Sequence, residues 1–490
     1  MTLFKKIAIT ISISSIIFLL ITSNSLLTSC SNQKGANDKS LISEFSPKKY
    51  RIQAIQDRGR LIAITDYNST DYFIYRGEPM GFQYEKLKMF ADYLGVGLEI
   101  KVAHSLNEAF SELEAGNVDV IAMGLTVTTD RSEHMDFTEP IIQTRQMLVQ
   151  RKPANWRKMH TWDDVDKSLV RNPIDLGGKT IYVQDGSAYA SRLNNLSEEI
   201  GKPITVMEDP LREVEQLVEA VDKGEIQYTI CDEILANFYE KLYPDLDIKT
   251  PVSFPQNLAW AVRQDSDSLE SVINTWLREF NNTTASRYLI DKYYNSPRTA
   301  FMAKSEHVSF NGGKISRFDE IMRDLSRKYD FDWRLLAALV YQESQFHPEV
   351  KSWSGAYGLM QMMPNTAAIF GIDSTSSPQE QIEAGIKYIK VIDRDLPKDI
   401  SDPDERMKFI LASYNIGMSH VLDARRLAQN NGKDPNVWTD NVDYFILNKS
   451  NPEFYKDTAV KYGYAKGKEA YDFVIEVLDR FEHYKNVIND

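Results

Sequence analysis

The stretch WRLLAALVYQESQFHP, residues 333–348, decides the fold of the last third of the chain. Counting from Leu336, apolar residues at i+3 and i+4 and the carboxyl group of Glu343 at i+7 share one face of a predicted helix, which ends before the proline. Burial and the negative end of the helix dipole both disfavour an ionised carboxylate. Glu343 is therefore a candidate proton donor near neutral pH, as general acid catalysis requires. The alternative is a helix-end glutamate whose carboxylate lies in solvent.

Two stretches further along the chain carry groups suited to sugars: GAYGLMQMMPNTA, residues 355–367, and ASYNIG, residues 412–417. Their glycines allow the backbone to pass close to a ligand or a helix. The amides of Gln361 and Asn415 and the phenol of Tyr414 suit sugar hydroxyl and N-acetyl groups. A glycine-rich turn over buried methionines, and a helix cap at Asn415, are the structural alternatives.

In this order and spacing, the three stretches resemble the catalytic domain of the soluble lytic transglycosylases, which shares an all-α, lysozyme-like fold with goose-type lysozyme. The resemblance covers about residues 314–490 and implies that Glu343 is the catalytic residue. The helices predicted in this domain are 315–329, 333–343, 378–394, 406–414 and 471–484. The residues that the resemblance places on the substrate are Ser344, Tyr357, Gly358, Gln361, Tyr414, Asn415 and Tyr471.

The sequence predicts the roles of two positions near the carboxyl group of Glu343. Ser344 directly follows Glu343 and is expected to orient it by hydrogen bonding. The closing stretch YGYAKGKEAYDFV, residues 462–474, matches the family's last motif, but Phe473 stands where related enzymes place a tyrosine near the catalytic carboxyl group. Tyr471 can replace that tyrosine only if the helix is rotated.

The three stretches hold no second carboxyl group, whereas two-carboxylate glycosidases need a pair at a defined separation. The resemblance implies a one-acid reaction on peptidoglycan, in which Glu343 protonates the oxygen between N-acetylmuramic acid and N-acetylglucosamine. Its carboxylate then takes the proton of the C6 hydroxyl group, which attacks C1 and leaves a 1,6-anhydromuramoyl end. A lysozyme-like hydrolase, with Asp373 or Glu383 as second carboxylate, and a binding lipoprotein with an inactive catalytic domain are the alternatives.

The N-terminal segment predicts export and a lipid anchor. Lys5 and Lys6 precede a largely apolar run that ends in LTSC, residues 27–30, which resembles a bacterial lipobox. Residues 1–29 are thus expected to be a signal peptide, and residues 30–57 an acylated Cys30 with a polar tether. The sequence after the cysteine favours the outer membrane, facing the periplasm. An uncleaved membrane anchor is the alternative.

Composition excludes some partners. At 490 residues the chain is too long for one ordinary core, and its net charge of −13 argues against nucleic acid. No His, Cys and Asp group has metal-ligand spacing, so we expect no metal and no cofactor. With Cys30 acylated, Cys231 has no cysteine to pair with and is expected in the core.

Between the tether and the catalytic domain, strands alternate with helices. The predicted order is strand 60–65, helix 81–95, strand 98–102, helix 106–115 and strand 118–122, which indicates an α/β domain with a mainly parallel sheet. The stretches GF (81–82), LEAGNVD (113–119) and TVTTDR (126–131) resemble the amino-acid-binding family of type-2 periplasmic solute-binding proteins, which have two lobes. The resemblance runs over residues 58–298, with lobe 1 at 58–149 and 257–298, lobe 2 at 150–256, and a link at 299–313.

That resemblance implies a site for a zwitterion, an amino acid or a muropeptide. Arg131 would clamp the ligand carboxylate and Asp232 would receive its ammonium group. Arg131 could instead form a surface pair with Asp130 or Asp136, and Gln83 replaces the usual acid after Gly-Phe. The remaining residues that the resemblance places around the ligand are Thr126, Thr128 and Ser187.

The order of lipobox, two-lobed α/β solute-binding-like domain and all-α lysozyme-like domain resembles the membrane-bound lytic murein transglycosylase F family over almost the whole chain. The multidomain fold class and a role in cell wall turnover follow as expectations. The solute-binding-like domain would sense its ligand and bias catalysis.

Overall fold

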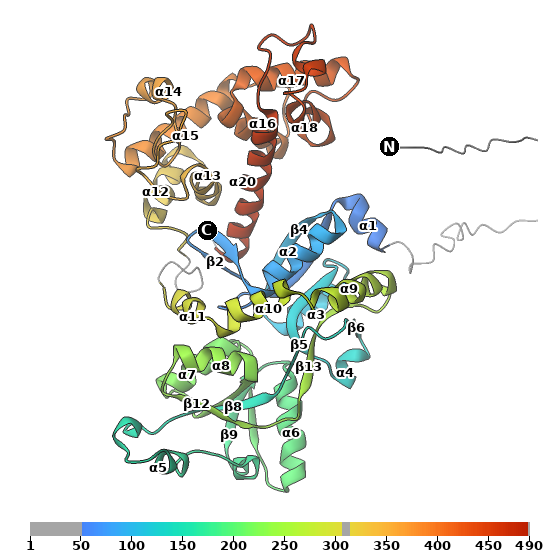
Figure 1. Cartoon of the computed structure of the whole chain (residues 1–490), viewed down its shortest axis with the longest axis vertical. Helices are drawn as coiled ribbons and strands as arrows, with labels where there is room; N and C mark the ends of the chain where they lie inside the picture. The colour runs from blue at the N-terminus through green and yellow to red at the C-terminus, as the bar shows by residue number, and fades with distance from the viewer. Residues whose placement is uncertain (1–50, 306–313, 489–490) are drawn as a thin grey trace, which may run out of the picture. The chain divides into compact units, whose positions relative to one another are not determined.

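The computed structural model describes residues 51–305 and 314–488 (Figure 1). The predicted signal peptide, Cys30 and residues 31–50 of the predicted tether lie outside these ranges, whereas residues 51–57, also predicted as tether, belong to a helix. No helix within them is long and apolar enough to cross a membrane.

The first sheet has the strand order β4-β1-β5-β13-β6, and β7 also pairs with β13. Strand β1 is parallel to β4 and β5, whereas β13 is antiparallel to its neighbours, so the sheet is mixed. Its strands are β1 (Arg60–Asp66), β4 (Gly97–Ala103), β5 (Val120–Thr126), β6 (Met135–Phe137), β7 (Ile142–Thr144) and β13 (Gln256–Arg263). Its helices are α1 (Arg51–Arg58), α2 (Phe82–Leu94), α3 (Leu106–Glu114), α4 (Thr129–Ser132), α9 (Asp267–Phe280) and α10 (Thr284–Ile290), followed by a π-helical turn, η4 (Asp291–Asn295).

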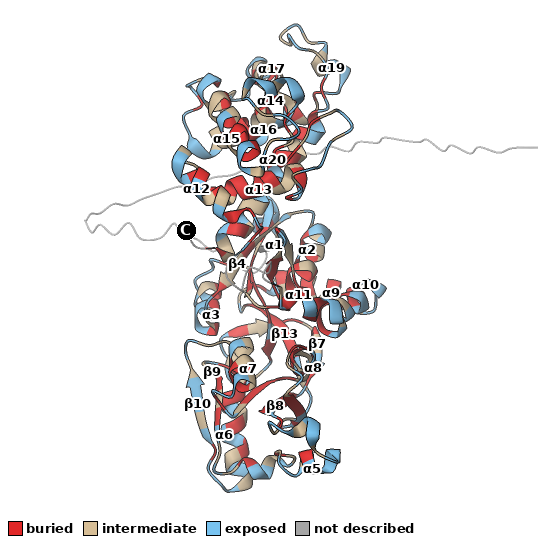
Figure 2. Ribbon diagram, turned by 90° about the vertical axis from the view of Figure 1, so that its left-hand side faces the viewer, coloured by how far each residue is buried: buried red, intermediate tan, exposed pale blue. Residues whose placement is uncertain are grey.

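The second sheet has the order β10-β9-β11-β8-β12. Its strands are β8 (Gln146–Arg151), β9 (Thr180–Gln184), β10 (Thr205–Asp209), β11 (Tyr228–Asp232) and β12 (Leu246–Pro251). Its helices are η2 (Trp156–Lys158), α5 (Trp162–Asp166), η3 (Pro173–Leu176), α6 (Ala188–Ile200), α7 (Val214–Lys223) and α8 (Glu233–Leu242). Strands β8 and β13 are largely buried, as Figure 2 shows, because helices cover them.

The chain crosses from the first sheet to the second earlier than predicted. Strand β7 ends at Thr144 and β8 begins at Gln146, so the crossing is at Arg145 and not near Gln150. Gln150 instead lies inside the second sheet, where its buried amide donates to Val170 O at 2.9 Å and to Asp247 Oδ1 at 3.2 Å. The return crossing falls between β12 and β13, where the sequence predicted it.

The predicted link begins as a helix, α11 (Pro297–Ala303). Ser296 caps it by accepting a hydrogen bond from Arg298 N at 3.1 Å, and proline suits its first turn. Ala300 and Ala303 are buried in the core that α8 also lines. Small apolar residues on one face therefore fold this segment onto the second sheet's helices.

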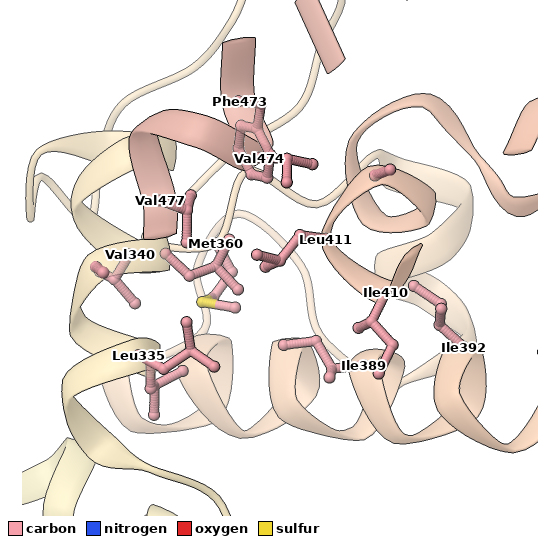
Figure 3. Close-up of a cluster of buried hydrophobic side chains, with 14 of the residues drawn as sticks. Leu335, Val340, Met360, Ile389, Ile392, Ile410, Leu411, Phe473, Val474 and Val477 are labelled. Carbon is pink, nitrogen blue, oxygen red and sulfur yellow. The ribbon is translucent and has the colours of Figure 1, made fainter. Parts of the chain in front are cut away.

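The C-terminal part is helical around one apolar core, whose side chains from α13, α15, α16 and α20 meet in Figure 3. Helix α12 begins at Asp319 and not at residue 315, because the Asp319 carboxylate accepts hydrogen bonds from Ile315 N and Ser316 N at 2.7 and 2.8 Å and holds these residues in a turn before the helix. The helices are α12 (Asp319–Tyr329), α13 (Trp333–Ser344), α14 (Pro364–Ile369), α15 (Pro378–Asp395), α16 (Pro403–Ile416), α17 (Met418–Asn430), η6 (Trp438–Val442), α18 (Asp443–Leu447), α19 (Pro452–Tyr455) and α20 (Gly467–Val487).

A hairpin of the α/β part, β2 (Phe73–Tyr75) and β3 (Glu78–Met80), packs on the helical part. At its turn, the carbonyl oxygen of Gly77 accepts hydrogen bonds from Tyr484 OH at 2.7 Å and Arg480 at 3.0 Å. A Cβ atom on Gly77 would lie 2.6 Å from the ring of Tyr341, which is on the same helix as Glu343. The hairpin thus touches the helix that carries the catalytic candidate.

Gly77→Ala is expected to destabilise the protein by about 2–4 kcal/mol, because the methyl group adds overpacking to the strain of a positive φ of 86°. Gly95→Ala is the matched control: its φ is 71°, but no atom lies within 4 Å of the added Cβ. Urea unfolding should show a loss of only about 1 kcal/mol for Gly95→Ala. Equal losses for both variants would contradict the close packing of the hairpin.

Candidate functional site

Glu343 lies in the last turn of α13 and opens onto a cavity with about 750 Å³ of empty space, part of it open to solvent. Burial raises the pKa of Glu343 to about 8, and no charged group contributes to the shift. The carboxyl group is therefore protonated at neutral pH, as the helix pattern predicted. Gln361, Tyr414 and Asn415, three of the predicted substrate residues, line the same cavity.

Two tyrosines form one wall of this cavity. Tyr414 donates a hydrogen bond to Met360 O at 2.7 Å, and its ring lies 5.3 Å from that of Tyr388. Burial and then the nearby charges of Glu343 and Tyr388 raise the pKa of Tyr414 well above its usual value. The phenol therefore stays neutral and can face a sugar ring and the catalytic carboxyl group without adding charge.

Tyr388 lines the cavity but is not among the residues predicted from the sequence. A signal for it exists in Gly385, one helical turn earlier, because a glycine inside a helix often marks close packing. A Cβ atom on Gly385 would lie 2.4 Å from the methyl carbon of Met360, the residue whose carbonyl group accepts from Tyr414. The other cavity residues that the sequence did not single out are Ser352, Ser354, Ala356, Met362, Met363 and Thr366.

Gln361 holds the loop before α14 in shape. Its backbone has a positive φ of 41°, and its amide nitrogen donates to Gly358 O at 2.9 Å and to Val350 O at 3.1 Å. Its side chain still lines the cavity. It thus stabilises the wall on which the predicted sugar contacts depend.

Gly358 and Tyr357 lie outside the cavity and have structural roles. Gly358 has a φ of 80°, and a Cβ atom there would lie 2.4 Å from Gln381 Oε1, which accepts from Leu359 N at 2.8 Å. Tyr357 donates to Ile372 O at 3.2 Å. Neither residue lines the space in front of Glu343, contrary to the placement that the resemblance implied.

Ser344 does not orient Glu343. Its buried hydroxyl group is hydrogen-bonded to Val340 O at 3.0 Å and to Leu359 O at 2.9 Å. It therefore ties the end of α13 to the following loop, because a helix leaves its last carbonyl groups unpaired and a serine there turns back to them.

The residues at the start of α20 do not line the cavity either. Phe473 is buried in the apolar core beside Val474, as Figure 3 shows. Tyr471 is half-buried, and burial followed by the charge of Asp443 raises its pKa. The helix rotation that would place Tyr471 at the catalytic carboxyl group is thus not observed.

Neither candidate for a second carboxylate faces the cavity. Glu383 accepts a hydrogen bond from Lys328 at 2.7 Å and another from Tyr329, and these donors lower its pKa to about 2. Asp373 caps its own loop, accepting from Thr375 N at 2.8 Å. Among the described residues that line the cavity, Glu343 is the only carboxylic acid.

A second cavity lies in the α/β part and has about 780 Å³ of empty space, part of it open to solvent. Four of the predicted ligand residues line it: Thr126, Arg131, Ser187 and Asp232. Thr128 does not; its hydroxyl oxygen accepts from Arg131 N at 3.3 Å and caps α4. The fold thus brings residues more than 100 positions apart in the sequence, such as Thr126 and Asp232, to one cavity.

The two lobes touch around this second cavity. The Arg131 guanidinium donates to Thr126 O at 3.0 Å and, across the lobes, to Gly186 O at 3.1 Å. Asn107 donates to Asp185 at 3.2 Å.

Gln83, which replaces the acid that usually follows Gly-Phe, has a structural role, because its amide oxygen accepts from the buried indole of Trp260 at 2.8 Å. Cys231 is buried in the core, as predicted.

Two family models match parts of this chain. Residues 320–437 match the family model of the transglycosylase SLT domain, and residues 61–296 match that of bacterial extracellular solute-binding proteins, family 3. A mutant of the arginine-binding protein ArgBP from T. maritima is a structural neighbour, at 24% identity and a TM-score of 0.43, covering 50% of this chain and 99% of its own.

Full-length relatives share both parts. The membrane-bound lytic murein transglycosylase F of Desulfosudis oleivorans is 34% identical over 88% of this chain and 91% of its own. The proteins of the same name from Stutzerimonas stutzeri and Pseudomonas putida are 30% and 31% identical, over 89% and 88% of this chain and 87% and 86% of theirs. With its two-lobed α/β part, its helical part and the half-buried acid of α13, the chain belongs to the membrane-bound lytic murein transglycosylase F family.

Proposed function

We propose that this protein cleaves the glycan strands of peptidoglycan as a lytic transglycosylase, with Glu343 as its only acid–base catalyst. One observation carries the proposal: a carboxyl group with a pKa of about 8 faces a cavity that no other described carboxyl group lines. Such a group is protonated at neutral pH, so it can act as an acid without a charged partner.

The reaction follows from one proton-carrying group. Glu343 donates its proton to the glycosidic oxygen between N-acetylmuramic acid and N-acetylglucosamine, and the bond from C1 to that oxygen breaks. The resulting carboxylate takes the proton of the muramoyl C6 hydroxyl group, and its oxygen bonds to C1. Water is not consumed, the product ends in a 1,6-anhydro ring, and Glu343 recovers its proton.

The neutral groups around Glu343 suit this reaction. Tyr414 and Tyr388 provide ring faces and phenol groups, and Asn415 and Gln361 provide amides, which can hold hydroxyl and N-acetyl groups. A second fixed charge would disturb the pKa of Glu343, and the cavity has none among the described residues that line it.

Mass spectrometry of the soluble products from purified peptidoglycan sacculi tests the reaction. The protein without its first thirty residues should release muropeptides lighter by one water than the hydrolysis products. Hydrated reducing ends would instead establish a hydrolase and require a second carboxylate. Absence of any release would favour the binding lipoprotein.

The pH dependence of cleavage should follow the raised pKa of Glu343. Activity (kcat/KM) on soluble glycan chains is expected to hold through neutral pH and to fall about tenfold per pH unit above about 8, where Glu343 loses its proton. A carboxyl group of ordinary pKa would instead lose its acid form above about pH 4.5. An activity maximum near pH 4.5 would contradict the role given to burial.

The α/β part is proposed to sense a small ligand in its cavity and to bias the helical part. Support comes from the four predicted ligand residues that line one cavity and from the hairpin that contacts α13. The protein would act in the cell envelope, attached through lipid on Cys30 to the outer membrane and facing the periplasm, as its lipobox-like sequence and the name of its relatives suggest.

A further inference from the structure

The cavity of the α/β part is strongly acidic. Arg131 is the one cationic side chain among the described residues that line it. In the described parts of the chain, no lysine or arginine lies within ion-pair distance of any of its carboxyl groups. The carboxyl groups that line it are Asp66, Asp71, Glu213, Glu215 and Asp232.

Neutral donors hold two of these carboxyl groups, those of Asp71 and Glu215, in place. Asp71 accepts from Asn68 at 3.0 Å and from Tyr294 at 3.3 Å. Glu215 accepts from Ser69 N at 2.9 Å. Hydrogen bonds from neutral groups fix the position of a carboxylate but leave its charge uncompensated, so each ionised group here repels the others.

Burial and this repulsion act on the same groups. Burial first, and then the charges of Glu215 and Asp71, raise the pKa of Glu213 to about 7. Burial raises the pKa of Asp71 to about 6, against the hydrogen bonds that it accepts. Burial and the charges of Glu213 and Asp71 raise the pKa of Asp66 as well. A cation placed among them would relieve the repulsion.

Two buried polar atoms of the cavity lack a partner and point to a ligand independently of the acidic cluster. Asp232 is 3% exposed and Ser187 is 8% exposed, and both line the cavity. Tyr189 donates to Asp232 Oδ2 at 2.9 Å, but Asp232 Oδ1 and the Ser187 hydroxyl group have no hydrogen-bond partner. Buried polar atoms are rarely left unpaired, so a bound molecule is expected to complete them.

The charges can be assigned to parts of one ligand. Arg131 and Asp232 match the carboxylate and the ammonium group of a zwitterion, which leaves four carboxyl groups for the rest of the molecule. A neutral side chain would leave all four uncompensated, and an anionic one would add to the repulsion. A metal ion is a poor occupant, because the described acidic, His and Cys residues include no group of three arranged to hold one.

We propose that this cavity binds an amino acid whose side chain ends in a second positive charge, of the lysine, ornithine or arginine kind, with that charge among Asp66, Asp71, Glu213 and Glu215. This specificity rests on the proposed sensing function and adds its ligand class. Free cationic amino acids and peptides that end in one share this chemistry.

Isothermal titration calorimetry of the protein without its first thirty residues tests the ligand class with L-lysine, L-arginine and L-norleucine, which has the length of lysine but no terminal ammonium group. Lysine or arginine is expected to bind at least about 100-fold more tightly than norleucine. Binding near pH 7 should also release protons, seen as a heat that depends on the buffer, because the cation lowers the raised pKa values. Norleucine binding equal to or tighter than that of both cationic ligands overturns the proposal.

Asp71→Asn keeps the shape of the side chain and removes its charge. It is expected to weaken lysine binding at least about tenfold and to leave norleucine binding unchanged or tighter. Asp164→Asn, an exposed aspartate outside the cavity, is the control and should change neither. An unchanged affinity of Asp71→Asn for lysine would overturn the assignment of the second charge to this cluster.

Failure of the ligand class and failure of the sensing function give different results. If norleucine, or meso-diaminopimelate with its two ammonium and two carboxylate groups and no net charge, binds and lysine and arginine do not, the cavity still senses a ligand but does not select a side chain of net positive charge. If none of the four binds at millimolar concentration, both the ligand class and amino acid sensing are overturned, while cleavage by Glu343 is unaffected.

Discussion

Replacing Glu343 by glutamine is expected to lower glycan cleavage at least about 10³-fold and, at the same time, to stabilise the folded protein at neutral pH. Glutamine keeps the shape of the side chain but carries no transferable proton, so both proton transfers of the reaction are lost. Binding of glycan chains should be unchanged, because the neighbouring amides and phenols remain. Product release from sacculi and a binding assay measure the two effects separately.

The stability gain follows from linkage. The pKa of Glu343 is about 8 in the folded protein and about 4.5 in the unfolded chain, so its stabilising contribution is greatest below pH 4.5 and is lost as the pH rises towards 8. At pH 7 the loss amounts to about 1–3 kcal/mol once partial exposure is allowed for. Glutamine has no such loss, so the difference between the two proteins should grow from pH 5 to pH 8.

Urea unfolding at pH 5 and pH 8 measures this difference. Glu349→Gln, an exposed glutamate six residues further on, is the matched control and should change neither activity nor stability. A Glu343→Gln protein that still cleaves glycan strands would contradict the one-acid mechanism. One that is inactive but no more stable at pH 8 would keep the mechanism and contradict the role of burial in raising the pKa.

How much of this site the sequence predicts depends on how local each feature is. The position of Glu343 on the apolar face of a helix follows from spacing within eight residues, and the structure confirms it. Tyr388 is separated from Glu343 by 45 residues and reaches the cavity only because α15 packs beside the loop of Met360. No pattern within one segment contains that contact.

The residues around Glu343 also show where a motif misleads. Gly358 and Ser344 belong to the predicted stretches, yet they serve backbone geometry, one through a positive φ and a close approach and the other through two carbonyl groups. A motif contains residues that maintain the fold around a site as well as residues of the site itself, and residue types alone do not distinguish the two roles. The burial and the hydrogen-bond partners of each side chain distinguish them.

The acidic cavity of the α/β part is the opposite case. Asp66 and Asp232 are 166 positions apart, and only Asp232 was predicted as a ligand residue, from the resemblance and not from a charged run. The crossing of the chain between the two sheets at Arg145 and between β12 and β13 brings their ends together. Topology therefore creates the charge cluster. Patterns within one segment can identify a single acidic residue, but they do not show that the five lie in one cavity.

Asp423→Ala is expected to be the most destabilising single change in the helical part, at about 3–5 kcal/mol. Asp423 is fully buried and accepts hydrogen bonds from Lys449 Nζ at 3.0 Å and from the backbone nitrogen atoms of Lys461 and Tyr462, both at 2.9 Å. Arg426 also donates to it. Removing the carboxylate leaves the fully buried ammonium group of Lys449 without its partner and releases the stretch that leads into α20.

Chemical unfolding should place this loss far above that of an exposed pair. Asp472→Ala, which breaks the surface pair with Lys468 at 2.6 Å, is the control and should cost less than about 1 kcal/mol. Lys449→Met should cost less than Asp423→Ala, because Arg426 and two backbone donors still compensate the carboxylate. The reverse order of these two variants would mean that the ammonium group, and not the carboxylate, organises the network. The carboxylate accepts hydrogen bonds from three separate segments, whereas Lys449 contributes only one of these donors. The loss for Asp423→Ala should therefore exceed that for Lys449→Met.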